Sequence, residues 1–344
     1  MWKRRLFSIP LLILLCNLWT GLLPVLLPVA LLVDLLRWRR FAATRTLFFF
    51  GAYLWAENLG ILACGLIWLL PASPEVYLAR NYALQSAWNK ALFEAGRRLY
   101  GMQVEMHWED PAEEVGRRPL LLLPRHVSTA DTVLPVGIFS VDHGIRLRFV
   151  LKEELLWDPC LDIVGNRVPN CFVRRARTAK AGTTGAAEVA ERAKATSAAE
   201  LQRVAQLGQG MGPGDGVLIY PEGTRFTKGK RRALLDKASP ELRSRVERFQ
   251  RVLPPVPGGT LALLENTLPA VDIWFCGHVG YEPAGSFKEL INGGLIGKVI
   301  RIHLWRRRGE ELPADAAARL AWLDAEWERM DRWVQSVSPE PKTG

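Results

Sequence analysis

The stretch LLLPRHVSTADTVLP, residues 121–135, contains the transition that decides the fold. A short run of leucines bounded by turn residues predicts a buried strand that ends at a proline. His126 follows that proline, and Asp131 comes five residues later. Residues five apart on a helix point roughly 140° away from each other, because each residue turns the helix by about 100°. The two side chains can therefore meet only if the chain turns directly after the strand.

A histidine and a carboxylate that meet in this way have a chemical use. A carboxylate bonded to one imidazole nitrogen fixes the tautomer and leaves the other nitrogen free as a base. The alternative is a buried polar pair in which Asp131 caps a helix. The spacing of His126 and Asp131 does not by itself decide between these interpretations.

The remainder of the chain alternates short apolar segments with helical ones. The predicted strands fall at 103–109, 119–124, 147–151, 170–175, 216–221, 270–279 and 298–305. The predicted helices fall at 76–101, 186–208, 239–252 and 320–337. Strands alternating with helices predict an α/β domain with a largely buried sheet.

The N-terminal 75 residues differ from the rest in composition. Residues 6–36 carry a single charge, Asp34, and residues 46–70 carry a single carboxylate, Glu57. Each run is longer than the roughly 20 residues that cross a bilayer. The first run is too long for a signal-peptide core, and no small-x-small cleavage site follows it.

These features predict three parts of the chain. Residues 1–75 form a retained membrane anchor with two hydrophobic segments, residues 76–338 form the main domain, and residues 339–344 form a tail.

Two arrangements of the anchor remain open. Basic residues flank the first run on both sides: Lys3, Arg4 and Arg5, then Arg37, Arg39, Arg40 and Arg45. If both runs span the bilayer, the second basic group lies outside the cytoplasm, against the positive-inside tendency. Three prolines, Pro10, Pro24 and Pro28, would also interrupt a straight helix. A hairpin within one leaflet avoids both problems, although two spans would also return the chain to its starting side.

The amino-acid composition restricts the kinds of partner that the protein can bind and the compartment in which it works. Hydrophobic residues make up 49% and charged residues 23%, which permits a sizeable core, and the net charge is +10. That surplus suits anionic lipid headgroups, phosphorylated substrates or nucleic acid. Only the charge favours nucleic acid, so no such partner is expected. Five scattered cysteines without a CxxC argue against a disulfide framework and a zinc site, and indicate a reducing compartment.

Two further stretches carry residues suited to anion binding. In LIYPEGTRF, residues 218–226, Gly223 lets the backbone approach a ligand and Arg225 can bind phosphate oxygens bidentately. In PNCFVRR, residues 169–175, an apolar strand ends in two arginines. The alternatives are a loop with a solvated arginine and an exposed strand end.

Taken in order, these stretches resemble the glycerolipid acyltransferases. The pattern is His-x4-Asp, then Phe-x-x-Arg, then Glu-Gly-Thr-Arg, behind a hydrophobic anchor. It is most similar to the 1-acylglycerol-3-phosphate (lysophosphatidic acid) acyltransferases over about residues 90–335. The segment from residue 300 onward also resembles the lysocardiolipin-type subgroup. The resemblance implies an α/β acyltransferase domain with a mixed sheet and no bound cofactor or metal.

The resemblance also implies roles for individual residues. His126 would be the general base and Asp131 its orienting partner. Arg175 matches the arginine of the second motif, and Arg174 occupies a variable position beside it. The third motif, in which the arginine holds the acceptor's phosphate, comprises Glu222, Gly223, Thr224 and Arg225.

VLPPVPGG, residues 252–259, is similar to the family's fourth motif, which helps to shape the acyl-donor site. Pro254 stands at the matching proline, whereas Pro255 stands where this subgroup often has arginine. Arg125 stands where the family often has asparagine. We expect Arg125 to add positive charge where an anionic substrate arrives.

The implied activity moves an acyl group from acyl-CoA or acyl carrier protein to the free hydroxyl of a lysophospholipid at the bilayer. The preferred product would be phosphatidic acid, and the domain would face the cytoplasm. One alternative is an acyltransferase or transacylase whose acceptor has a larger headgroup. The other is a non-catalytic membrane protein that binds anionic lipids through Arg174, Arg175, Arg225 and the arginines at 306–308.

Overall fold

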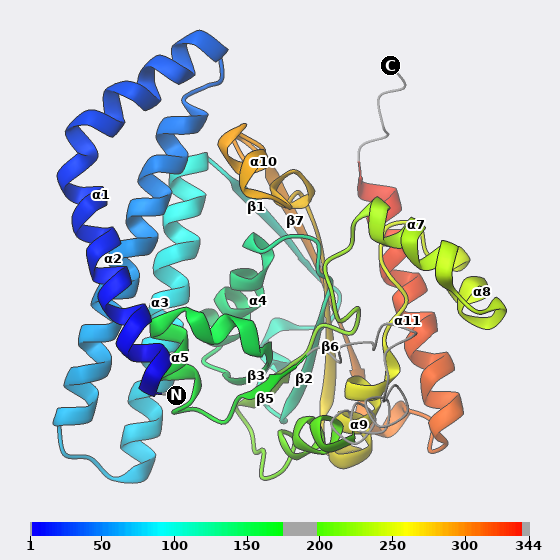
Figure 1. Cartoon of the computed structure of the whole chain (residues 1–344). Helices are drawn as coiled ribbons and strands as arrows, with labels where there is room; N and C mark the ends of the chain where they lie inside the picture. Colours follow the sequence, from blue (N-terminus) through cyan, green and yellow to red (C-terminus); the bar gives the residue numbers. More distant parts are fainter. Residues whose placement is uncertain (1, 175–197, 339–344) are drawn as a thin grey trace, which may run out of the picture.

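The computed structural model of the whole chain describes residues 2–174 and 198–338 (Figure 1). Within these residues, seven strands form one sheet in the order β1-β7-β6-β2-β5-β3-β4. The strands are β1 (Gln103–Trp108), β2 (Leu120–Pro124), β3 (Arg146–Lys152), β4 (Cys171–Val173), β5 (Asp215–Leu218), β6 (Asp272–Val279) and β7 (Val299–Arg308). The predicted α/β fold with a mixed sheet is confirmed.

Strand direction places the ends of five strands together. β2 pairs in parallel with both β5 and β6, and β3 pairs in parallel with both β5 and β4. β7 runs antiparallel to β6 and parallel to β1. The carboxyl ends of β2, β3, β4, β5 and β6 therefore meet at one edge of the sheet. In sheets of this kind, ligands bind outside that edge.

The strand β2 lies at the centre of a two-sided core. Its four leucines are completely buried. Leu120 and Leu122 pack into the apolar cluster on one face, and Leu121 and Leu123 pack into the cluster on the other, as the two-residue period of a strand requires. Figure 1 shows α3, α4 and α5 on the first face and α9 and α11 on the second.

In the main domain, α3, α8 and α11 fall on predicted helical segments, and the other helices were not predicted. The helices are α3 (Pro74–Tyr100), α4 (Leu134–Val136), α5 (Pro159–Gly165), α7 (Lys228–Lys237), α8 (Pro240–Arg248), α9 (Pro257–Thr267), α10 (Phe287–Ile291) and α11 (Ala316–Val337). Residues 198–206 are also helical, and the remainder of the predicted helix at 186–208 is outside the described residues or beyond its end. Short 3₁₀ turns cover Ala112–Glu114, Ala130–Val133, Glu153–Trp157, Glu282–Ala284 and Gly309–Glu311, and a π turn covers Gly137–Asp142.

Both apolar runs form long helices, α1 (Trp2–Arg37) and α2 (Ala42–Leu69). Both are long and apolar enough to cross a membrane, which makes them a candidate anchor. The expected interruption by proline is wrong, because α1 continues through Pro10, Pro24 and Pro28. Apolar helices tolerate prolines where neighbouring groups satisfy the freed carbonyls. Figure 1 shows that α1 accommodates them by curving along its length.

The two carboxylates of the apolar runs have structural partners. Asp34 accepts hydrogen bonds from the backbone nitrogens of Ala43 (2.8 Å) and Thr44 (2.9 Å), so it caps the start of α2 from the preceding helix. Glu57 accepts a hydrogen bond of 3.2 Å from the backbone nitrogen of Cys160, which ties α2 to α5. Each carboxylate therefore joins two helices.

Both ends of α1 are attached to the main domain. Near its start, Arg4 and Arg5 form ion pairs of 2.6 and 2.8 Å with Asp162 of α5, which is completely buried. After its end, Arg39 donates a 3.2 Å hydrogen bond to the carbonyl of Asn292. A helix of 36 residues is roughly 54 Å long at about 1.5 Å per residue. The helix α1 therefore lies alongside the domain instead of projecting from it.

Candidate active site

The loop after β2 brings His126 and Asp131 together. Nδ1 of His126 lies 2.9 Å from Oδ1 of Asp131. The other carboxylate oxygen accepts hydrogen bonds from the backbone nitrogens of Val127 (2.6 Å) and Ser128 (2.8 Å). The chain thus turns directly after the strand, and Asp131 holds both that turn and the imidazole ring.

The charge state of Asp131 fixes the tautomer of His126. Asp131 is completely buried. Burial alone would raise its pKa, but the hydrogen bond from His126, the nearby His278 and the Val127 backbone bond together lower the pKa below its ordinary value. An ionised carboxylate only accepts hydrogen bonds, so Nδ1 of His126 carries the proton. Its Nε2 is then the free basic nitrogen.

Two aromatic residues that the sequence analysis did not single out surround this pair. The rings of Tyr220 and His126 lie 4.4 Å apart, centre to centre. Nε2 of His278 lies 2.8 Å from the carbonyl of Arg125 and 3.6 Å from Asp131. His278 is completely buried, and burial lowers its pKa, so it is a neutral donor to that carbonyl. The sequence signal that could have identified His278 is its position as a histidine within the apolar strand segment 272–279.

The third-motif loop is fastened to the backbone of the first. One oxygen of Glu222 accepts from the backbone nitrogen of His126 (3.1 Å), and the other accepts from that of Leu253 (2.9 Å). The backbone nitrogen of Phe226 donates to the carbonyl of His126 (2.7 Å). Gly223 has a φ of 62°, the left-handed conformation that glycine adopts without strain. Glu222 therefore positions three loops from a buried location.

Arg225 connects the loops that follow β2, β5 and β6. Its Nη1 donates to the hydroxyl of Thr129 (2.8 Å) and to the carbonyl of Gly285 (3.0 Å). The neighbouring Thr224 accepts a 2.8 Å hydrogen bond from Nζ of Lys230. Within the described residues, Nε and Nη2 of Arg225 make no hydrogen bond to protein, so they remain available to a ligand.

A cavity of about 930 Å³ adjoins this cluster. Arg225, Thr129 and Tyr220 belong to its wall, and Tyr220 is the residue that packs against His126. Much of the remaining wall is apolar or aromatic and includes Phe49, Trp88, Phe93, Val133, Leu151 and Leu290. The cavity therefore extends from the polar loops to the helices α2 and α3. A pocket of this size and character suits a ligand with a long apolar part.

The prediction for Arg125 is wrong. Its side chain is 1% exposed and faces the protein interior. It donates to Glu282 (2.7 Å) and to the carbonyls of His278 (2.6 Å) and Arg251 (2.9 Å). A buried guanidinium is stable only when it is paired and hydrogen-bonded. Arg125 thus joins the loops around the site and adds no free charge for a substrate.

The other predicted binding residues have different positions. Arg174 pairs with Glu153, and its side chain is 72% exposed and does not line the cavity. Arg175 lies outside the described residues. Pro254 is buried one residue after Leu253, beside the third-motif loop.

The arginines at 306–308 lie far from this site along the sheet. Arg306 pairs with Asp272, the first residue of β6, so it is at the edge opposite the carboxyl ends. Arg307 pairs with Glu326. The non-catalytic lipid-binding alternative therefore loses two of the cations on which it depended. Among the described residues, no group of three histidine, cysteine or carboxylate side chains could hold a metal.

Comparison with known proteins adds to this geometry. The model of the Acyltransferase family matches residues 103–253, which contain the His126 and Glu222 loops. No curated protein matches the sequence. Among solved structures, the fold is similar to the crystal structure of the 1-acyl-sn-glycerophosphate (LPA) acyltransferase PlsC from Thermotoga maritima. That match has a TM-score of 0.52 and 12% identity, and it covers 86% of this chain and 100% of the other.

At this identity the structural likeness shows the fold. The family match over residues 103–253 supports membership of the Acyltransferase family. Neither finding identifies the lysocardiolipin-type subgroup.

Glu222 gives the fold a predicted dependence on pH. Burial raises the pKa of Glu222 from 4.5 to about 8, although its backbone hydrogen bonds and Arg125 oppose the shift. Between these two values the folded protein holds a proton that the unfolded chain has released, so rising pH favours unfolding. Relative to Glu222→Gln, wild-type stability should fall by about 1.4 kcal/mol per pH unit across this range.

The measurement is denaturant unfolding of both proteins in detergent at a series of pH values. Glu222→Gln also loses a backbone hydrogen bond, because its amide nitrogen cannot accept, but that cost of about 1–3 kcal/mol is independent of pH. A difference between the two proteins that stays constant from pH 4 to about 9 would show that Glu222 is ionised in the fold.

Proposed function

We propose that this protein is a membrane-bound acyltransferase that moves an acyl group from a thioester to the free hydroxyl of a lysophospholipid. The proposed acceptor is 1-acylglycerol-3-phosphate, which yields phosphatidic acid. The observation that carries the proposal is the hydrogen-bonded His126–Asp131 pair, packed against Tyr220 beside a large apolar cavity. A basic nitrogen, an anion-binding arginine and space for a hydrocarbon chain are what this reaction needs.

The proton transfer follows from the tautomer of His126. Its Nε2 removes the proton from the acceptor hydroxyl as that oxygen attacks the thioester carbonyl. The carboxylate of Asp131 stabilises the imidazolium that forms, as in other histidine–aspartate pairs. The thioester carbon–sulfur bond then breaks, and the imidazolium returns its proton to the departing thiolate. No covalent acyl-enzyme is required.

The two substrates are proposed to occupy different surfaces around this pair. The acyl chain lies in the apolar cavity, and the acceptor's phosphate binds the open Nε and Nη2 of Arg225. The carrier of the thioester is proposed to be CoA or acyl carrier protein. A lysophospholipid with a larger headgroup is the alternative acceptor, because the same residues would serve it.

The anchor is proposed to lie in one leaflet with the domain on the cytoplasmic side. The attachment of both ends of α1 to the same domain supports this arrangement. If α1 crossed the bilayer, one of these attachments would have to form on the opposite side of the membrane from the domain. The exposed leucines and aromatic residues of α1 and α2 would face the acyl chains.

Substitution of the proposed base tests the reaction. His126→Ala should reduce acyl transfer from acyl-CoA to 1-acylglycerol-3-phosphate by about 10²–10⁴-fold, which is the usual contribution of a general base. Asp131→Asn should be comparably severe, because an amide can stabilise the wrong tautomer. His107→Ala is the matched control, since His107 is exposed on β1 at the edge of the sheet and should leave activity unchanged. Retention of activity by a folded His126→Ala protein would exclude the mechanism.

Arg225→Lys tests recognition of the phosphate. The substitution keeps the charge but loses the bidentate geometry, so KM for the lysophospholipid should rise while KM for the acyl donor stays unchanged. Arg174→Ala is the control for a general loss of positive charge, because Arg174 is exposed and paired with Glu153. A rise in the donor's KM alone would reverse the proposed placement of the two substrates. A panel of lysophospholipids, with products resolved by mass, identifies the acceptor.

The one-leaflet arrangement makes a separate prediction. A cysteine introduced at Arg40, in the turn between α1 and α2, should react with a membrane-impermeant thiol reagent from the side on which the catalytic domain lies. The five native cysteines are buried, which keeps the background low. Labelling of sealed vesicles only from the opposite side would establish two spans.

A further inference from the structure

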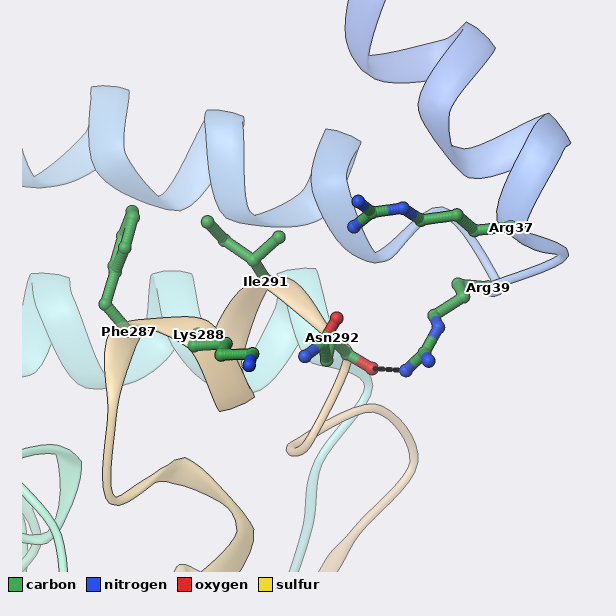
Figure 2. A pocket seen from close by; sticks show the side chains of 6 residues that line it. All are labelled: Arg37, Arg39, Phe287, Lys288, Ile291 and Asn292. Atoms are coloured by element: carbon green, nitrogen blue, oxygen red, sulfur yellow. Dashed lines mark hydrogen bonds between the residues drawn. The ribbon is translucent and has the colours of Figure 1, made fainter.

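A second hollow lies between the end of α1 and the helix α10 (Figure 2). It has a volume of about 550 Å³ and is remote in sequence from the His126 loop. Its lining residues are Arg37, Arg39, Phe287, Lys288, Ile291 and Asn292. Figure 2 shows that the guanidinium of Arg39 reaches the carbonyl of Asn292 and that Lys288 extends toward that same residue.

The hollow concentrates positive charge that the protein does not neutralise. Arg37, Arg39 and Lys288 are all exposed, and none of them forms an ion pair within the residues that the structure describes. The nearest carboxylates along the chain are already used: Asp34 caps α2, and Glu289 caps the start of α10 through Ser286. The end of a helix contributes only about half a negative charge. Three cations in one hollow therefore favour an anionic ligand.

The surroundings of the hollow are apolar and aromatic. Trp38 is 90% exposed, Phe41 is 57% exposed, and Phe287 on α10 is 64% exposed. Leu35 and Leu36 of α1 are also exposed beside Arg37. Exposed aromatic rings next to arginines are typical of the level of phospholipid headgroups at a membrane surface. A soluble anion would use the cations but would leave these rings without a partner.

We propose that this hollow binds the phosphate of an anionic membrane phospholipid, at a site distinct from the catalytic one. The phosphate lies among Arg37, Arg39 and Lys288, and the acyl chains continue into the leaflet beside α1. Phe287 lines both this hollow and the large cavity. The proposal does not depend on the acyl-transfer reaction.

Vesicle binding tests the proposal on the full chain. The probes are vesicles of phosphatidylcholine alone and of phosphatidylcholine mixed with phosphatidylglycerol. Attraction to the surface alone is worth roughly fivefold per cation, so each of Arg37→Gln, Arg39→Gln and Lys288→Gln should weaken binding to the anionic vesicles by more than that, and the triple variant should lose more than about 100-fold. Its binding to phosphatidylcholine alone and its activity on detergent-dispersed lysophospholipid should not change. Equal binding of variant and wild type to the anionic vesicles would overturn the proposal.

Arg40→Gln distinguishes binding of a phosphate in the hollow from general attraction between a positive surface and an anionic membrane. Arg40 is exposed in the same turn but does not line the hollow. A loss as large as that of Arg39→Gln would show that only the surface charge matters, and would refute the site. If the triple variant does not fold, Arg37→Gln and Lys288→Gln serve singly, because neither side chain forms a hydrogen bond within the described residues. Each should weaken binding more than Arg40→Gln does.

Two further arms identify the source of the phosphate and separate the two proposals. In calorimetric titrations with inorganic phosphate, the wild type and the triple variant should behave alike. Phosphate binding that disappears in the triple variant while vesicle binding persists would assign the hollow to a soluble anion and reject the lipid. The vesicle experiment is repeated with His126→Ala protein, which should still bind the anionic vesicles. The lipid site and the acyl-transfer mechanism are thus tested separately, and either can fail without the other.

Discussion

The buried carboxylate of Asp131 is the constraint on which the site depends. A carboxylate that is buried away from water must be hydrogen-bonded. Asp131 accepts from three donors: Nδ1–H of His126 and the backbone nitrogens of Val127 and Ser128. These donors occupy consecutive residues, so satisfying the charge also fixes the turn after β2 and the orientation of the imidazole ring. The energetic demand of one side chain thus sets the geometry of the proposed base.

The loops around Asp131 are joined by a second set of buried polar groups. His278 holds the carbonyl of Arg125, whose guanidinium reaches the chain at Arg251 and at Glu282. Glu222 joins His126 to Leu253. Hydrogen bonds between side chains and the backbone therefore connect the loops after β2, β5 and β6. This explains why residues far apart in the chain contribute to one small volume at the sheet edge.

The strand segments could be predicted from sequence because the period of two and the turn residues are local signals. For His126 and Asp131 the local pattern supplied only the condition for a contact, namely a turn directly after the strand. The role of Arg125 was not predictable. Its partners Arg251 and Glu282 lie more than 100 residues away, and a local pattern does not show which way a loop arginine points. The curved path of α1 through three prolines likewise depends on packing that local rules omit.

The boundary in composition near residue 75 is not a boundary in packing. The helix α2 contributes Phe49 and Tyr53 to the wall of the large cavity, and its Glu57 binds the backbone of α5. At the start of α1, Arg4 and Arg5 neutralise Asp162, which would otherwise be an unpaired buried charge in the domain. The helix α2 thus completes the cavity, and both apolar helices present an apolar surface. Because α2 forms part of the cavity wall and Tyr220 of the same wall packs against His126, the apolar N-terminal region and the proposed base border one cavity.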